Sequence, residues 1–255
     1  MPEKKYAIVT PYYKEDAGLL RRCIASVKAQ SVPTDHFMVA DGYAQPWIDE
    51  TGVRHVKLDR SHGDFGNTPR GLGGLLAACE DYEGIGFLDA DNWLEADHVA
   101  SCMAAARTVP DCDFVVAQWH LRRPDETILD IPTEPISEHV DTNCFFMLPG
   151  SYHVIHHFGI MPRQLSPICD RIFYAAVRTA KLTFAVVPHK TVNYHCLWSS
   201  LYAAIGEKPP AGAKPNIDMA PVDQWLLAQT PRQLEIASRR AGVRFAMPEG
   251  HPTAG

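Results

Sequence analysis

Two aspartates, Asp89 and Asp91, follow a short apolar run at 85–88 that is typical of a buried strand. In an extended backbone, residues i and i+2 point to the same side, so the two carboxylates can converge on one point. Two anions that close repel each other unless a cation lies between them. Hard oxygen ligands suit Mg²⁺ or Mn²⁺, which keep several waters and take further ligands from substrate phosphates. The pair therefore predicts a metal-bound diphosphate.

This segment allows two interpretations besides a metal site. Asp-x-Asp triplets often open a helix, here with Asp89 or Asn92 as the N-cap of a helix over 93–98, and this alternative stays open. The Asp-x-Asp-x-Thr nucleophile motif of phosphotransferases does not match, because Trp93 occupies the fifth position and the motif lies far from the first strand.

The elements before Asp89 alternate between strand-like and helix-like patterns, as in an open α/β sheet. Such sheets bind ligands at the carboxyl ends of their strands, so polar residues there are candidate site residues. Strands are predicted at 6–10, at 36–40, which ends at Asp41-Gly42, and at 53–58. A helix with the apolar face Leu19, Leu20, Cys23, Ile24 and Val27 follows the first strand, and a glycine-rich loop at 61–74 and a helix through 75–79 precede the strand of Asp89. Three strands thus place side chains at one edge of the sheet.

With these blocks in this order, the chain resembles the family 2 glycosyltransferases, nucleotide-sugar enzymes of the GT-A fold. The blocks that carry the resemblance are 7–14 with 26–31, then 39–42, 66–73 and 88–91. The fold that it implies is α/β, with a mixed, mostly parallel central sheet flanked by helices. A glycosyltransferase domain at 1–205 would combine a Rossmann-like nucleotide half at 1–112 with an acceptor half at 113–205.

The resemblance also implies roles for individual residues at the donor site. Thr10 and Tyr12, with Pro11 between them, would flank the nucleobase, and Tyr12 would stack on it. Each role has a structural alternative. Tyr12 and Tyr13 could simply cover the sheet edge, and Arg70 could form an ion pair with Asp64. His195 could be a structural residue without a ligand. The remaining donor-site assignments are Asp41 at the base or ribose, Arg70 at the base or diphosphate, Asp89 and Ala90 at the nucleotide, Asp91 and Asp89 as ligands of Mn²⁺ or Mg²⁺, and His195 as a third metal ligand or phosphate contact.

Several positions depart from the family pattern. Tyr13 stands where asparagine is usual, Asp41-Gly42-Tyr43 lacks a second acid, and Arg70-Gly71 lacks the usual Arg-Asn pair. These departures leave the donor base and sugar open more than the fold. The Gln-x-x-Arg-Trp block of processive synthases is missing, which favours transfer of a single sugar.

The second half is expected to supply the acceptor side. Strands are predicted at 113–120, 141–148, 184–188 and 191–195, and an amphipathic helix at 168–177. The resemblance implies that Asp170, at the head of that helix, is the catalytic base, whereas a purely structural carboxylate there would stabilise the helix dipole. Acceptor or sugar contacts are predicted for Asp141, Thr142, Asn143 and Arg171; His153, His156 and His157 fit no strong zinc spacing and could line the acceptor pocket.

Composition sets the remaining expectations. The chain has 255 residues, a formal charge of -6 and no basic stripe, which argues against nucleic acid as a partner. Its seven cysteines are scattered without Cys-x-x-Cys spacing, as expected of reduced thiols in a cytoplasmic protein. The N-terminus has no signal-peptide pattern, and no apolar run approaches the roughly 20 residues that span a bilayer, so at most peripheral membrane association is expected.

After the acceptor half, residues 206–255 are expected to form a linker and a C-terminal helical extension. The segment 206–221 is rich in Pro and Gly, which predicts an extended linker or lid. Helices are predicted at 222–228 and 231–241, with Thr230 as the N-cap of the second. Residues from Pro248 onward are expected to be loose.

The sequence thus predicts a metal-dependent, inverting, non-processive glycosyltransferase that moves a sugar from a nucleoside diphosphate donor to an acceptor hydroxyl. UDP is the default nucleotide from the resemblance, and a cell-envelope or exopolysaccharide glycan is the expected acceptor. Two alternatives remain: a nucleotidyltransferase on a similar sheet, although no glycine-rich, Arg-bearing loop directly follows the first strand, and a nucleotide- or sugar-binding protein without catalysis.

Overall fold

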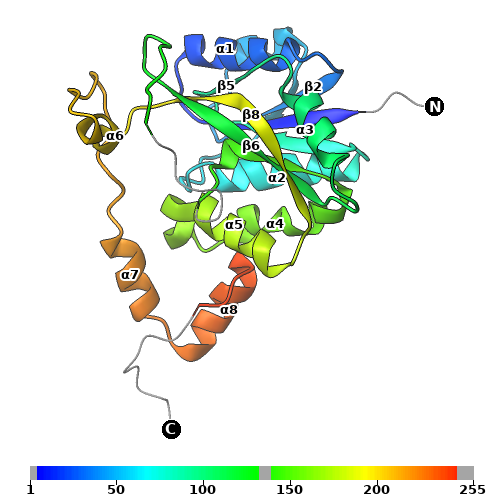
Figure 1. Cartoon of the computed structure of the whole chain (residues 1–255). Helices are drawn as coiled ribbons and strands as arrows, with labels where there is room; N and C mark the ends of the chain where they lie inside the picture. Colours follow the sequence, from blue (N-terminus) through cyan, green and yellow to red (C-terminus); the bar gives the residue numbers. More distant parts are fainter. Residues whose placement is uncertain (1–4, 132–138, 246–255) are drawn as a thin grey trace.

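A mixed sheet forms the centre of the molecule, which a computed structural model describes for residues 5–131 and 139–245. The segment expected to be loose from Pro248 lies outside this range. Within the described residues the sheet has eight strands in the order β3-β2-β1-β4-β7-β6-β8-β5 (Figure 1). The strands are β1 (Tyr6–Tyr12), β2 (Thr34–Ala40), β3 (Arg54–Lys57), β4 (Gly84–Phe87), β5 (Trp93–Leu94), β6 (Phe114–Arg122), β7 (Phe145–Met147) and β8 (Phe184–His195).

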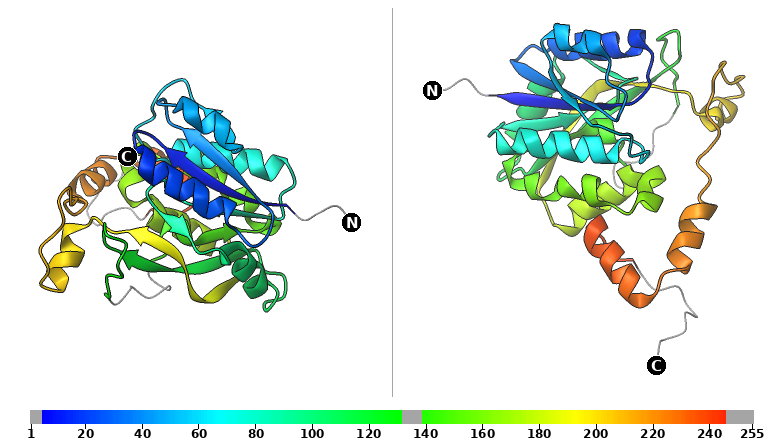
Figure 2. Two further views of the ribbon diagram at one scale, coloured as in Figure 1. Left: turned by 90° about the horizontal axis from the view of Figure 1, so that it is seen from above. Right: turned by 180° about the vertical axis from the view of Figure 1, so that it is seen from behind.

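Helices cover both faces of the parallel strands β1 to β4. Successive strand residues point to opposite faces: Met38 of β2 clusters with Leu20 and Ile24, which lie on α1, whereas Val39 lies against Gly73 of α2. The two helices therefore lie on opposite faces, as Figures 1 and 2 show. A sheet buried on both faces requires continuous apolar runs, which 6–9, 37–40 and 84–87 supply; β3, at the sheet edge, has exposed Arg54 and Lys57 instead. The α-helices before β6 are α1 (Ala17–Lys28), α2 (Asn67–Cys79) and α3 (His98–Ala106), and a 3₁₀ turn η1 (Pro46–Thr51) follows β2.

The second half continues the same sheet. β7 pairs antiparallel with both β4 and β6, β8 pairs parallel with β6, and β5 pairs antiparallel with β8. Phe158 of α4 stacks on Phe173 of α5 with ring centroids 3.8 Å apart, which ties these helices together beneath the sheet. The helices here are η2 (Thr142–Cys144), η3 (Pro149–Val154), α4 (His156–Ile160), η4 (Arg163–Ile168) and α5 (Cys169–Thr179).

The predicted glycine-rich loop at 61–74 is wrong in its second half, because α2 already begins at Asn67. The glycines of this stretch serve close packing instead of loop flexibility. A Cβ built on Gly71 would lie 2.6 Å from the backbone nitrogen of Gly159 on α4. A Cβ on Gly73 would lie 2.6 Å from a methyl of Val9. Tertiary packing therefore overrides the low helix propensity of glycine here.

Three other boundaries differ from the sequence prediction. The segment after Asn92 forms β5 instead of opening a helix, and α3 begins only at His98. Of the predicted strand at 141–148, residues 142–144 form η2, with the Asp141 side chain as the N-cap, and only 145–147 are extended. β8 runs without a break through Pro188, which lies where the register with β6 shifts, so its missing N–H removes no ladder bond there.

The C-terminal extension docks on the main body through a small apolar cluster. Val222 of α7 and Ala241 of α8 pack with Met161 and Leu165 of the α4–η4 region. Thr230 forms the predicted N-cap of α8, in a capping box with Gln233. In Figure 1 the extension leaves the body after α6 (Ser199–Ala204), descends through α7 (Ala220–Leu227) and returns with α8 (Pro231–Ala241) to α4 and α5. In the described part of the chain, none of the helices has the length and apolar character needed to cross a bilayer.

Candidate active site

A cavity of about 470 Å³ opens at the carboxyl ends of β1, β2 and β4. This volume lies within the range of small-molecule sites. We call it the donor cavity. The residues of the predicted donor site that line it are Pro11, Tyr12, Asp41, Arg70, Asp89, Ala90 and Asp91.

Arg70 is the most deeply buried charge of the donor cavity, with its residue only 3% exposed. Its Nη2 donates to Asp89 Oδ1 at 2.6 Å and its Nη1 donates to Asn67 Oδ1 at 3.1 Å. The alternative pairing with Asp64 is wrong, because Asp64 accepts instead from the backbone N–H and the hydroxyl of Thr68. Arg70 therefore fixes the orientation of the Asp89 carboxylate at the end of β4.

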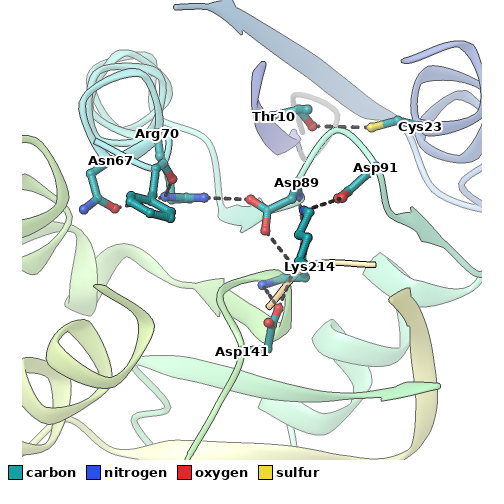
Figure 3. A network of polar contacts seen from close by, with 10 residues as sticks. Thr10, Cys23, Asn67, Arg70, Asp89, Asp91, Asp141 and Lys214 are labelled. Carbon is teal, nitrogen blue, oxygen red and sulfur yellow. Dashed lines mark hydrogen bonds and ion pairs between the residues drawn. The ribbon is translucent and has the colours of Figure 1, made fainter. Parts of the chain in front are cut away.

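Asp91 lies next to Asp89 with its carboxylate turned into the donor cavity (Figure 3). Burial, and after it the charge of Asp89, raises the pKa of Asp91 to about 6. The Nζ of Lys214 lies 3.9 Å from Asp91 Oδ2, which is an ion pair but longer than a hydrogen bond. The carboxylate is thus held where its charge is costly, which is the condition that a bound cation relieves.

These two carboxylates fit a magnesium or manganese ion that shares its ligands with a substrate. Within the described residues, no group of three or more His, Cys, Asp or Glu side chains is arranged to hold a metal. A divalent ion here would take Asp91 and Asp89 from the protein and its other ligands from phosphate and water, as Mg²⁺ does.

A chain of polar contacts leads from Asp89 into the second half of the protein. Asn143, 1% exposed, donates from Nδ2 to Asp89 Oδ2 at 3.1 Å, and its Oδ1 accepts from the backbone N–H of Asp89. The backbone N–H of Asn143 donates to Asp141 Oδ1 at 2.9 Å. Burial, followed by the charges of Asp89 and Asp170, raises the pKa of Asp141 to about 7. Thr142, 5% exposed, completes the η2 turn that holds these groups.

A second cavity of about 490 Å³ adjoins the first, and Tyr194 and Trp198 line both. We call it the acceptor cavity. Asp141 and Arg171, two of the four residues predicted for the acceptor side, line it together with the predicted base Asp170. Asp170 Oδ2 lies 2.6 Å from Nε2 of His139. The indole N–H of Trp198 donates to the Tyr194 hydroxyl at 2.8 Å, which fixes the shared wall.

Thr10 and Tyr12 have their hydroxyl groups paired within the protein. Thr10 is fully buried and its hydroxyl pairs with His36 Nε2 at 2.8 Å. Tyr12 is 2% exposed, and its hydroxyl lies 2.6 Å from His55 Nε2 and accepts from the backbone N–H of Gln45. Tyr12 nevertheless lines the donor cavity, and its predicted stacking on a base stays a prediction.

Asp41 and His195 also have specific surroundings. Asp41 Oδ1 accepts from Nδ1 and the backbone N–H of His62, at 2.7 and 2.9 Å, so this carboxylate anchors the 61–62 loop at the cavity wall. His195 does not line either cavity. Burial, with the charges of Arg22 and Lys214, lowers its pKa. The ribose contact of Asp41 and the metal contact of His195 stay predictions.

The histidines on and before α4 lie away from the acceptor cavity. His156 Nδ1 contacts the carbonyl oxygen of His153, and His157 Nδ1 lies 3.0 Å from the carbonyl oxygen of Arg240 in α8. None of the three lines the acceptor cavity, so that possibility is wrong. Their contacts are those of a turn and of the docked extension.

Four residues of the site were not predicted: Lys214, His139, Tyr194 and Trp198. Lys214 lies in the Pro- and Gly-rich segment that was interpreted as a linker or lid, and no spacing rule connects it to Asp91. Tyr194 is the penultimate residue of β8 and Trp198 follows it by four residues, so their place at a strand end was the one available signal. His139 has no recognisable pattern around it.

Comparisons with known proteins agree with this architecture. No family model matches the chain. Over 118 residues, 42% of this chain, it is 31% identical to the succinoglycan biosynthesis protein ExoW of Rhizobium meliloti (strain 1021), and the match spans 36% of that relative. The S. aureus TarS structure superposes with a TM-score of 0.54 at 12% identity, covering 79% of this chain and 38% of TarS. The structure of S. aureus TarS 1-349 in complex with UDP superposes with a TM-score of 0.56 at 12% identity, covering 92% of this chain and 70% of the TarS chain.

The chain has the GT-A glycosyltransferase fold. The sequence expectation of an α/β GT-A architecture is therefore confirmed, including the strand order that brings Asp41, Arg70, Asp89 and Asp91 to one edge. The chain spans about a third of the ExoW relative, so its activity is a matter for proposal.

Proposed function

We propose that this GT-A protein transfers one sugar from a UDP-sugar to a hydroxyl group of a glycan acceptor, with inversion at the anomeric carbon. One observation carries the proposal: the donor cavity, with the Asp89–Asp91 pair, meets the acceptor cavity, with Asp170, along the wall formed by Tyr194 and Trp198. A leaving-group site and a candidate base on adjoining cavities are the two parts that sugar transfer needs.

Uracil is the base that the comparisons support, because TarS 1-349 is described in complexes with UDP and with UDP-GlcNAc. In this chain the exposed ring at the mouth of the donor cavity is Tyr13, 39% exposed, and not Tyr12. Tyr43 meets it edge to face with ring centroids 4.8 Å apart, which holds the Tyr13 ring in place. A fixed, exposed aromatic face can stack on a pyrimidine.

The donor's diphosphate is assigned to the space beside Asp91 and Arg70. Asp91 and Asp89 would hold Mn²⁺ or Mg²⁺, which when bound offsets negative charge on the departing diphosphate. Arg70 donates to one oxygen of the Asp89 carboxylate and Asn143 donates to the other. These two hydrogen bonds hold the carboxylate that faces the diphosphate in one orientation. Preorganisation of this kind avoids a reorganisation cost during the reaction.

Asp170 is assigned as the base that takes the proton of the acceptor hydroxyl. It lines the acceptor cavity at the head of α5, and its Oδ2 is oriented by His139. Asp141 is the second acid of this cavity, and its pKa of about 7 leaves it partly protonated at neutral pH. Because a pKa near the working pH suits a general base, Asp141 is the alternative candidate, and the assignment to Asp170 rests on its place at the head of α5 in the acceptor cavity.

For the acceptor, an extracellular polysaccharide intermediate is the proposed class, since the ExoW relative is named for succinoglycan biosynthesis. The cavity offers indole and phenol rings of Trp119, Trp198 and Tyr194, against which the apolar face of a sugar can pack. Single transfer and action at the cytoplasmic side, with at most peripheral membrane contact, complete the proposal.

Calorimetric titration with UDP, with and without Mn²⁺, tests the donor half, and product analysis tests the reaction. We expect metal-dependent UDP binding and slow release of UDP from a UDP-sugar, accelerated by an oligosaccharide acceptor. A nucleotidyltransferase would instead release pyrophosphate from UTP and a sugar phosphate. Tight UDP binding without any turnover across a panel of UDP-sugars and oligosaccharides would assign the chain to the non-catalytic binders.

A further inference from the structure

Lys214 brings a positive charge into the donor cavity from a segment far along the chain. Its Nζ lies 3.9 Å from Asp91 Oδ2, and its side chain remains 53% exposed (Figure 3). Arg70 and Lys214 are the Lys and Arg residues among the described residues lining this cavity. Arg70 is committed to Asp89 at 2.6 Å, whereas the ammonium of Lys214 lies beyond hydrogen-bond distance of its carboxylate partner.

The backbone around Lys214 is fixed in spite of the Pro- and Gly-rich sequence. The N–H of Lys214 donates to the carbonyl of Leu197 at 2.7 Å. The carbonyl of Lys214 accepts from the backbone N–H of Ser199 at 3.0 Å and from its hydroxyl at 2.8 Å. These three bonds attach the segment to the residues that follow β8, and the Lys214 ammonium lies 5.9 Å from the centroid of the Trp198 ring. A loose linker would not hold one side chain at one place in this way.

The charges of the cavity indicate what this lysine is for. Five acidic side chains among the described residues line it, against the two cations Arg70 and Lys214; the acids are Glu15, Asp41, Asp64, Asp89 and Asp91. A diphosphate adds further negative charge beside Asp91, at the point where the Lys214 ammonium has donors to spare, since an ammonium carries three. A phosphate oxygen is a stronger acceptor for it than a carboxylate 3.9 Å away.

We propose that Lys214 binds the diphosphate of the donor, its ammonium moving from Asp91 to a phosphate oxygen when the nucleotide enters. This inference rests on the proposed function. The segment that carries Lys214 continues into the wall of the acceptor cavity at Asn216, Ile217 and Met219. Lys214 thus lies in a segment that contributes to the walls of both cavities.

The test compares two substitutions in the same segment, Lys214→Met and Lys208→Met. Methionine keeps an unbranched side chain and removes the charge; Lys208 is exposed and lines neither cavity. Affinities for UDP and for uridine are measured by calorimetry in buffer saturated with Mn²⁺. For Lys214→Met we expect UDP affinity to fall about tenfold while uridine affinity is unchanged, as loss of one charge-assisted hydrogen bond requires. Lys208→Met should match the unsubstituted protein for both ligands.

A Lys214→Arg variant separates charge from shape, and we expect it to keep UDP affinity within about threefold of the unsubstituted protein. Equal UDP affinity in Lys214→Met and the unsubstituted protein overturns the inference and leaves the proposed function standing. Equal losses for UDP and uridine also overturn it, because they indicate a collapsed segment. If the unsubstituted protein binds neither ligand, the proposed function itself fails.

Discussion

Replacing Asp91 by asparagine should stabilise the metal-free protein at neutral pH while abolishing metal-dependent nucleotide binding. The carboxylate of Asp91 is charged at pH 7 in the unfolded chain and in the folded chain, but in the folded chain burial and Asp89 oppose the charge and raise its pKa from 3.8 to about 6. A folded state that binds the proton more tightly than the unfolded state loses stability as pH rises. The amide carries no charge and escapes this loss.

The size of the effect follows from the shift. A change from 3.8 to about 6 is roughly two pKa units, or about 3 kcal/mol at the upper limit. The side chain keeps 26% of its surface exposed, so solvent screens part of the repulsion and we expect about 1–2 kcal/mol. For a domain of this size that corresponds to a Tm increase of about 2–8 °C. The stability gain of Asp91→Asn should be absent below about pH 4, develop between about pH 4 and about pH 6, and be complete above about pH 6.

Calorimetric melting of the two proteins at pH 4 and pH 7.5, in EDTA, measures this difference. Glu50→Gln, an acid-to-amide change at an exposed position outside both cavities, provides the matched control and should leave Tm unchanged. Addition of Mn²⁺ with UDP should then raise the Tm of the unsubstituted protein and of Glu50→Gln but not of Asp91→Asn. A Tm for Asp91→Asn that falls at both pH values by the same amount would refute the reasoning, since the carboxylate would then be stabilising whatever its charge.

The remaining predictions address the base, the nucleotide and the packing of α2. Asp170→Asn should lower the single-turnover transfer rate by roughly 10²–10⁴-fold with UDP and Mn²⁺ affinity intact, and a near-normal rate would move the role to Asp141. Tyr13→Ala should raise the KM for the donor about fivefold with little change in kcat, whereas an unchanged KM in steady-state assays would place the base elsewhere. Gly71→Ala should destabilise by about 1–3 kcal/mol in urea titrations, because its Cβ meets the backbone of Gly159 at 2.6 Å; a stability gain would show that the helices can separate freely.

The sequence was sufficient to predict which acidic residues lie at the carboxyl edge of the sheet. Asp41 directly follows β2, and Asp89 lies two residues after the end of β4. Since parallel strands end at the same edge, their convergence could be predicted from the order of the elements. Arg70 could be placed by its family resemblance, although its partner could not. The pairing with Asp89 depends on how closely α2 approaches β4, which local sequence does not encode.

Contacts between distant segments account for the features that sequence reasoning missed. Tyr12 follows a strand and looks available for stacking, but its burial is decided by η1 and β3, which supply Gln45 and His55 to its hydroxyl. Lys214 reaches Asp91 across 123 positions of sequence, through backbone bonds at the end of β8. No periodicity or spacing rule reports on a contact of that separation. Such contacts are set by tertiary packing alone.

The short strand β5 has a consequence for how the protein can be divided. Residues 88–92 connect β4, near the middle of the sheet, to β5 at its far end, where Trp93 pairs with Asn193 and Leu94 with Val192 of β8. The loop that carries both aspartates is therefore tied to a strand about a hundred positions later in the chain. A fragment ending at 112 would lack that partner, so the nucleotide half should not form a working metal site as a separate piece, and the two halves should unfold together.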